Sequence, residues 1–259
     1  MGYRSTRGRN TIQTIAFINQ KGGVGKTTTV INTGAGMALS GKKVLLVDMD
    51  PQSHLTASLA IVHHPDKTIY EVLKGELAAA DAIIKRSNGL FVLPSAITLS
   101  TLEKELKGKK WLEILLKEAL KGIKGYDYIL IDCPPSLGIL TTNALITARE
   151  VYIPVQTQYL ALLGLNHLLT TFEVAKRLNK PLKIGGAICT HYDSRSLLNR
   201  NSAQEIKDFF KDKVCKTFIR ETIALAEAPS YGQTIFEYKP NSLGAEDYLS
   251  LTKEILERE

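Results

Sequence analysis

The 259-residue sequence lacks the features of membrane and secreted proteins. No apolar stretch approaches the roughly 18–20 residues that a membrane-spanning helix needs, and the first ten residues are polar and basic instead of forming an apolar signal. Cysteine is scarce: Cys133, Cys189 and Cys215 are odd in number, far apart and form no CxxC pair. These absences exclude a disulfide framework and a local zinc ribbon, and they predict a reducing, cytoplasmic compartment.

Acidic residues are in the minority, with 26 Asp and Glu against 33 Lys and Arg, for a net charge of +7. Residues 1–9 hold three arginines and no acid, and residues 195–220 hold seven basic and three acidic residues, so the rest of the chain is neutral. Residues 103–124 form a further lysine-rich stretch. Such patches suit a polyanionic partner, although lysine-rich helix faces are also common on ordinary solvated surfaces.

Short apolar runs alternate with longer stretches of helical periodicity. Near-continuous runs such as residues 44–47 and 128–131 are typical of strands that are buried on both faces. The alternation predicts a doubly wound, mostly parallel sheet with helices on both faces. We expect a disordered basic arm at residues 1–11 and one α/β domain at residues 12–259. The expected strands are 14–19, 43–48, 90–94, 126–132, 151–155, 184–190 and 214–219, and the expected helices are 26–39, 111–120, 160–178 and 202–210.

The strongest chemical signal is KGGVGKTT, between an expected strand and an expected helix. Its glycines let the backbone wrap around phosphate oxygens with the N–H groups inward, and the start of the helix adds its positive dipole. Lys26 is placed to reach the β- and γ-phosphates of a nucleotide, and the Thr27 hydroxyl is placed to ligate Mg²⁺. The predicted nucleotide-binding residues of this loop are Lys21, Gly22, Gly23, Val24, Gly25, Lys26, Thr27 and Thr28.

Two carboxylates follow other expected strands. Asp50 lies in the segment VDMDPQ, and Asp132 follows four apolar residues. A carboxylate beyond a parallel strand faces the ligand crevice of such a sheet. The position of Asp132 is that of a Walker B residue, which holds Mg²⁺ through water. Either aspartate alone could be an ordinary helix cap, but together with the phosphate loop they indicate an active site.

The loop departs from the usual GxxxxGK[ST] pattern, because Gln20 occupies the place of the first glycine and a second lysine, Lys21, follows it. KGGVGKTTT resembles the deviant Walker A loop of the ParA/MinD/Soj group of P-loop ATPases. The resemblance implies that Lys21 reaches across a nucleotide-sandwich dimer to the partner's phosphates, with Gly22 where the two loops approach. DMDPQ and DCPP resemble the group's DxDPQ and DxPP motifs. The implied catalytic residues are Lys21, Lys26 and Asp50, of which Asp50 positions the attacking water, and the implied Mg²⁺ ligands are Thr27 and Asp132.

The resemblance extends from about residue 12 to residue 255. PVQTQY, THYDSR and LAEAPSYG are similar to segments of the chromosome- and plasmid-partition branch, ParA/Soj. The short N-terminus indicates the Soj-like type without an operator-binding domain, and residues 248–259 lack the basic membrane helix that ends MinD-type proteins. The resemblance therefore implies a Mg²⁺-dependent ATPase that forms an ATP-dependent homodimer, binds double-stranded DNA non-specifically and works with a ParB-like partner. It also implies a cytoplasmic protein without membrane contact, whose ATP form lies on the nucleoid.

Parts of the implied DNA surface depart from the family. Arg195 matches the arginine of the family's T-M-Y-D-x-R motif, but Glu221 and Ala224 occupy positions where many Soj-like proteins have arginines, and Arg220 replaces a proline. Other basic residues nearby could compensate. The family holds adenine close to this stretch, which implies nucleotide contacts by Ile219, Arg220 and Glu221. The implied DNA-binding residues are Arg195, Arg200, Lys207, Lys216 and Arg220.

Two alternative functions share the same ATPase machinery. One is a positioning ATPase for another cargo, either a protein or a membrane-associated body. The other is a metal-cluster or cofactor-maturation ATPase, because iron–sulfur relatives bridge a cluster with cysteines and Cys133 adjoins Asp132. No second cysteine has suitable spacing, and Cys189 and Cys215 lie in apolar strand patterns, so we expect buried structural thiols.

Overall fold

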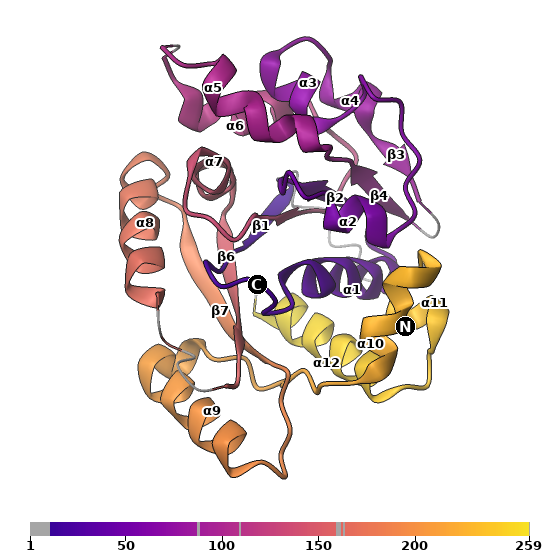
Figure 1. Cartoon of the computed structure of the whole chain (residues 1–259), viewed down its shortest axis with the longest axis vertical. Coiled ribbons are helices and arrows are strands. Elements are labelled where there is room, and N and C mark those ends of the chain that lie inside the picture. Colours follow the sequence, from indigo (N-terminus) through magenta and orange to yellow (C-terminus); the bar gives the residue numbers. More distant parts are fainter. Residues whose placement is uncertain (1–10, 87–88, 109, 159–161, 163, 259) are drawn as a thin grey trace, which may run out of the picture.

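Among the residues that the structure describes, seven strands form one sheet in the order β3-β4-β2-β5-β1-β6-β7 (Figure 1). The computed structural model describes residues 11–86, 89–108, 110–158, 162 and 164–258. Every neighbouring pair of strands is parallel except β3 with β4. The strands are β1 (Gln13–Phe17), β2 (Val44–Asp48), β3 (Ile84–Lys85), β4 (Leu90–Leu93), β5 (Tyr128–Asp132), β6 (Glu150–Gln156) and β7 (Lys183–Thr190).

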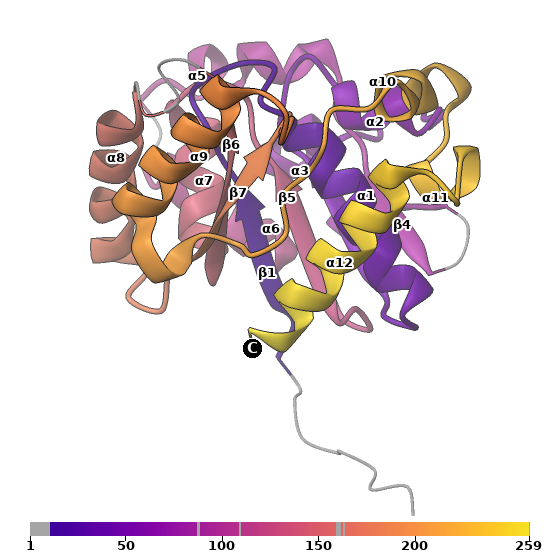
Figure 2. The ribbon, with the colours of Figure 1, turned by 90° about the horizontal axis from the view of Figure 1, so that it is seen from below.

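Helices cover both faces of this sheet. The α-helices are α1 (Lys26–Leu39), α2 (His54–Ser58), α3 (Ile69–Lys74), α4 (Ala79–Ala82), α5 (Leu102–Glu105), α6 (Leu115–Leu120), α7 (Ile139–Thr147), α8 (Leu165–Leu178), α9 (Leu197–Phe210), α10 (Ile223–Glu227), α11 (Ile235–Tyr238) and α12 (Leu243–Glu257). Short 3-10 helices are η1 (Ile97–Thr101), η2 (Leu112–Ile114), η3 (Lys211–Lys213) and η4 (Ala228–Tyr231). Figure 2 shows α12 lying beside α1, with which it is in contact.

The core has two parts, one on each face of the sheet. In β1, Ile15 and Phe17 point into the part covered by α1 and α12, whereas Ala16 points into the part covered by α3 and α6 to α9. Residues of β2 and β5 alternate in the same way. Because successive side chains of a strand point to opposite faces, a strand covered on both sides needs apolar residues at every position. The predicted doubly wound fold with its mostly parallel sheet is therefore confirmed.

Six of the seven expected strands are present to within two residues at each end, and helix α1 has the predicted bounds. Helix α9 begins at Leu197, five residues earlier than expected, because the Ser196 side chain caps it by accepting from the backbone N–H of Asn199. The expected helix 111–120 is divided into η2 and α6. The first turn of the expected helix 160–178 lies largely outside the described residues, and α8 begins at Leu165.

The prediction of a strand over residues 214–219 is wrong. The segment runs beside β7, and two of its amide groups donate to carbonyl oxygens of β7 at 2.8 Å. In the described chain, however, only one isolated bridge, between Ala187 and Val214, joins the two. Between these contacts the Glu254 carboxylate accepts the amides of Lys216 at 2.6 Å and Thr217 at 2.9 Å. A side chain of α12 thus accepts hydrogen bonds from backbone amides that, in a strand, would donate to a neighbouring strand. The two-residue strand β3 has too little pattern to be predicted.

Residues 1–10 of the predicted basic arm lie outside the described residues, and the division of the chain at residue 12 stays a prediction. No helix in the described ranges is long and apolar enough to cross a membrane.

Candidate nucleotide-binding and catalytic site

The predicted catalytic residues meet at the carboxyl edge of the sheet, toward which the parallel strands point in Figure 2. The phosphate loop follows β1, Asp50 follows β2, and Asp132 is the last residue of β5. Strand β5 lies between β1 and β2, and Asp132 pairs in register with Phe17 on one side and Asp48 on the other. The topology therefore brings together residues that are more than 100 positions apart in the chain.

The backbone of the phosphate loop has two left-handed glycines and a hydrogen bond from the end of β7. Gly23 and Gly25 have φ values of 72° and 80°, a left-handed conformation that glycine adopts without strain. The Thr190 hydroxyl, at the end of β7, donates to the carbonyl of Val24 at 2.9 Å. A Cβ atom added at Gly23 would meet nothing within 4 Å. A side chain of β7 thus holds the loop backbone at Val24, and the space beside Gly23 is open.

Lys26 begins α1 and is 7% exposed. Its ammonium donates to the carbonyl of Lys21 at 3.3 Å. Burial lowers the pKa of Lys26, and the negative charges of its neighbours, chiefly Asp132, oppose that shift. A buried ammonium whose partners are a backbone carbonyl and nearby carboxylates is suited to neutralising a phosphate.

Asp132 and Thr27 fit a magnesium site. The Thr27 hydroxyl donates to one carboxylate oxygen of Asp132 at 2.7 Å, and the other oxygen is buried without a hydrogen-bond partner in the described structure. Burial raises the pKa of Asp132 well above its ordinary value and the charge of Asp48 adds to this, whereas Thr27 and Lys26 lower it. In the described ranges no group of three or more His, Cys, Asp or Glu could hold a metal alone. Mg²⁺ typically binds through one or two protein oxygens together with water and substrate phosphates.

Asp50 is 6% exposed, and its carboxylate accepts the amide of Gln52 at 2.9 Å. Its neighbour Asp48 has no predicted role, yet it is fully buried at the end of β2. Burial raises the pKa of Asp48 to about 6, although hydrogen bonds from Thr56 and from the Asp50 amide lower it. The Asp48 side chain is held by these donors.

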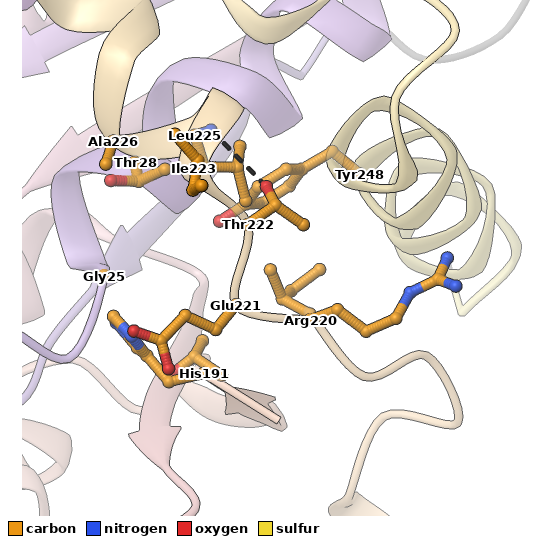
Figure 3. A pocket seen from close by; sticks show the side chains of 12 residues that line it. Gly25, Thr28, His191, Arg220, Glu221, Thr222, Ile223, Leu225, Ala226 and Tyr248 are labelled. Carbon is orange, nitrogen blue, oxygen red and sulfur yellow. Dashed lines mark hydrogen bonds between the residues drawn. The ribbon is translucent and has the colours of Figure 1, made fainter. Parts of the chain in front are cut away.

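A cavity of about 510 Å³ adjoins the loop beside Gly25 and Thr28 (Figure 3). Its volume is within the range of small-molecule sites. The three residues predicted to contact the nucleotide base, Ile219, Arg220 and Glu221, all line it. The prediction missed other lining residues, which come from the end of β7 and the residue after it, from α10 and the residue before it, and from α12, with no shared spacing. These are Thr190, His191, Thr222, Ile223, Leu225, Ala226 and Tyr248.

The Arg220 side chain points away from this cavity, toward α12 (Figure 3). Its guanidinium donates to Asp247 at 2.5 Å and to Glu246 at 2.8 Å. Both carboxylates raise the pKa of Arg220 above its ordinary value, and the hydrogen bonds to Asp247 have the larger effect. The guanidinium of Arg220 therefore does not face the cavity. Although Arg220 is one of the predicted DNA-binding residues, its charge is already paired with two carboxylates.

The other predicted DNA-binding residues lie on or near α9. Arg195 precedes α9, is 90% exposed at its side chain, and makes two 3.0 Å bonds to Asp193. Arg200 donates to the carbonyl of Ser194 at 2.7 Å. Lys207 and Lys216 line one surface cavity, so the structure brings these two together. Binding of DNA by these residues stays a prediction.

The three cysteines are free and buried, as expected. Burial raises the pKa of Cys133 well above its ordinary value and raises the pKa of Cys189 and of Cys215 to about 12. These thiols therefore remain protonated, which is typical of structural cysteines.

The nucleotide site of a P-loop ATPase is defined by three parts, which this chain has: a strand, a glycine loop that ends in Lys26 and Thr27, and a second strand that ends at Asp132. The family model described as AAA domain matches residues 12–184. The chain belongs to the ParA/Soj group of the MinD/ParA family, and it hydrolyses ATP.

Curated relatives and solved structures are similar to this chain over nearly its whole length. The chain is 48% identical to the sporulation initiation inhibitor protein Soj of Bacillus subtilis, over 93% of this chain and 97% of that protein. It is 44% identical to the chromosome-partitioning ATPase Soj of Treponema pallidum, over 95% and 98%. Among solved structures, a cobyrinic acid a,c-diamide synthase from Mycobacterium smegmatis with a bound ATP analogue and magnesium superposes with a TM-score of 0.84 at 37% identity, covering 95% of this chain and 94% of that chain.

Proposed function

We propose that this ATPase forms a homodimer around two ATP molecules, binds double-stranded DNA whatever its sequence, and segregates chromosomes or plasmids with a ParB-like partner. The observation that carries the proposal is Lys21, which is exposed at the mouth of the loop and has no ion pair with the described residues. Because Lys26 already serves the phosphates of its own subunit, Lys21 is available to a second subunit. The names of the curated relatives support the partition role. In this proposal the protein is cytoplasmic, and its ATP form lies on the nucleoid.

The same proposal assigns the nucleotide and metal contacts. The loop amides and Lys26 bind the phosphates, the cavity lined by Ile219 and Glu221 takes the base, and Thr27 and Asp132 hold Mg²⁺. The metal supplies charge neutralisation to the phosphates. The orphaned, buried oxygen of Asp132 supports this assignment, because an unpaired buried carboxylate oxygen is costly unless a cation or donor meets it.

Replacing Lys21 with alanine is expected to weaken dimerisation by about tenfold or more while ATP binding to the monomer changes by less than about threefold. The reason is that the Lys21 charge acts across the interface, whereas Lys26 acts within the subunit. Light scattering with ATP, ADP and no nucleotide gives the oligomeric state, and Lys180→Ala, an exposed lysine on the loop after α8, is the matched control. A dimer that forms without ATP, or that ignores Lys21, would contradict the sandwich arrangement.

DNA binding by the ATP-bound dimer is expected to fall steeply with salt and to differ little between duplex sequences, because phosphate contacts release counterions without reading bases. Arg195→Ala should weaken binding to every duplex alike and make the slope of log affinity against log salt shallower by about one unit or less. The measurement is a salt series with two unrelated duplexes. Asp50→Ala protein keeps ATP unhydrolysed in this assay, and Arg149→Ala, at the opposite edge of the sheet, is the control.

If the ATP-bound dimer ignores DNA even at low salt, the partition role fails and a positioning ATPase for a protein or membrane cargo is the better hypothesis. A cofactor-maturation role has the likeness to the synthase structure in its favour. The higher identity to the partition proteins and the three buried, protonated cysteines favour partition over it.

A further inference from the structure

Three buried polar side chains surround the backbone of Asp50. Asp48 ends β2, Thr56 lies on the short helix α2, and Ser95 follows β4. Asp48 and Ser95 are fully buried and Thr56 is 4% exposed. Burying three polar side chains in one place costs free energy unless each finds hydrogen-bond partners, so their partners indicate what the cluster does.

The bonds form a closed ring that begins and ends at Asp50. The amide of Asp50 donates to Asp48 at 3.1 Å, and the Thr56 hydroxyl donates to Asp48 at 2.7 Å. The same Thr56 oxygen accepts the amide of Ser95 at 3.0 Å. The Ser95 hydroxyl then donates to the carbonyl of Asp50 at 2.9 Å.

Side chains therefore contact both backbone groups of Asp50, and its carbonyl also accepts the amide of Ser53 at 2.9 Å. A second bond, from the Thr56 amide to Asp48 at 2.9 Å, anchors the ring to α2. Asp50 lies two residues after the end of β2, directly after Met49, whose amide still donates to the carbonyl of Asp132 in β5 at 2.9 Å. The ring continues from this last contact with the sheet, and it connects Asp50 to the end of β2 and to the residue that follows β4 and Pro94.

We propose that Thr56 and Ser95 are positioning residues for hydrolysis: through this ring they fix the backbone of Asp50 so that its carboxylate faces the attacking water. The inference rests on the proposed role of Asp50. Neither hydroxyl lies in the phosphate loop or lines the base cavity, so neither is placed to affect nucleotide binding. A displacement of about 1 Å of a catalytic group is enough to cost rate without costing affinity.

The test separates positioning from folding. Ser95→Ala and Thr56→Val each remove one hydroxyl, and Thr56→Ser restores the hydroxyl without the methyl group. We expect kcat to fall by about tenfold or more in the first two variants, with KM and the affinity for a fluorescent ATP analogue within about twofold of wild type. Thr56→Ser should recover most of the rate. Thr252→Val is the matched control, because within the part of the chain that the structure describes this buried hydroxyl bonds only to a carbonyl of its own helix, α12.

The variants are measured beside Asp50→Ala, and thermal melting checks that each one folds. Unchanged kcat in Ser95→Ala and Thr56→Val, with Asp50→Ala inactive, would overturn the ring proposal alone. Parallel losses of melting temperature, ATP affinity and kcat would also overturn it, since they would indicate a purely structural role. Full turnover in Asp50→Ala would instead show that the proposed function of Asp50 itself is wrong.

Discussion

Lys26→Ala protein is expected to lose ATP binding, with an affinity at least about 100-fold below wild type, or roughly 2.8 kcal/mol. Lys26 is buried at the start of α1, and burial makes its charge effective because little water screens it. Without it, the phosphates would enter a site that holds Asp132 and Asp50 close by, and their negative charges would repel the nucleotide. The loop amides would remain but could not neutralise that charge.

Titration with a fluorescent ATP analogue in Mg²⁺ measures this effect. Lys180→Ala, which removes an exposed lysine outside the site, should bind as the wild type does. A melting curve without nucleotide distinguishes a folded protein that cannot bind from one that has unfolded. Wild-type affinity in Lys26→Ala would mean that the phosphates do not lie where the loop and α1 place them.

The fold and the meeting of the predicted catalytic residues at one edge of the sheet were predictable because each follows a local pattern. The run of four apolar residues before Asp132 predicts a strand buried on both faces, and β5 is the middle strand of the sheet. A polar residue after such a run must lie at a strand end. Since the carboxyl ends of parallel strands share one edge, the meeting of Lys26, Asp50 and Asp132 follows from three separate local patterns.

What could not be predicted depends on contacts between distant segments. The ring around Asp50 joins Asp48, Thr56 and Ser95, and nothing in the spacing of a threonine and a serine indicates that both meet one backbone. The wrong prediction of a strand at residues 214–219 also comes from a contact between distant segments. The apolar pattern of this segment is that of a strand, but the Glu254 carboxylate accepts two of its amide groups. Likewise, the sequence gives no sign that Arg220 forms ion pairs with Asp247 and Glu246, which lie on a distant helix.

Asp50→Ala protein is expected to bind ATP with an affinity close to or slightly above wild type and to hydrolyse it at least about 100-fold more slowly, the size of effect that a positioned acid–base group supplies. The carboxylate lies beyond β2, and its charge is felt at Lys26 and Asp132, which are the predicted phosphate and metal contacts. Removing a negative charge there cannot weaken phosphate binding through electrostatics. Removing a carboxylate that orients water does slow the attack on the γ-phosphate.

Nucleotide affinity and turnover must be measured separately in this variant, because the prediction is that they diverge. Asp50→Asn keeps the shape of the side chain and the contact with the Gln52 amide but removes the charge. If this variant loses as much turnover as Asp50→Ala, the effect comes from the charge of the carboxylate and not from a change in the loop. Asp81→Ala, an exposed carboxylate on α4, controls for net charge and should hydrolyse ATP normally. With ATP the Asp50→Ala protein should persist as a dimer in light scattering, since its nucleotide stays intact. Normal turnover would remove Asp50 from the mechanism, and a joint loss of affinity and turnover would place it among the residues that bind the nucleotide.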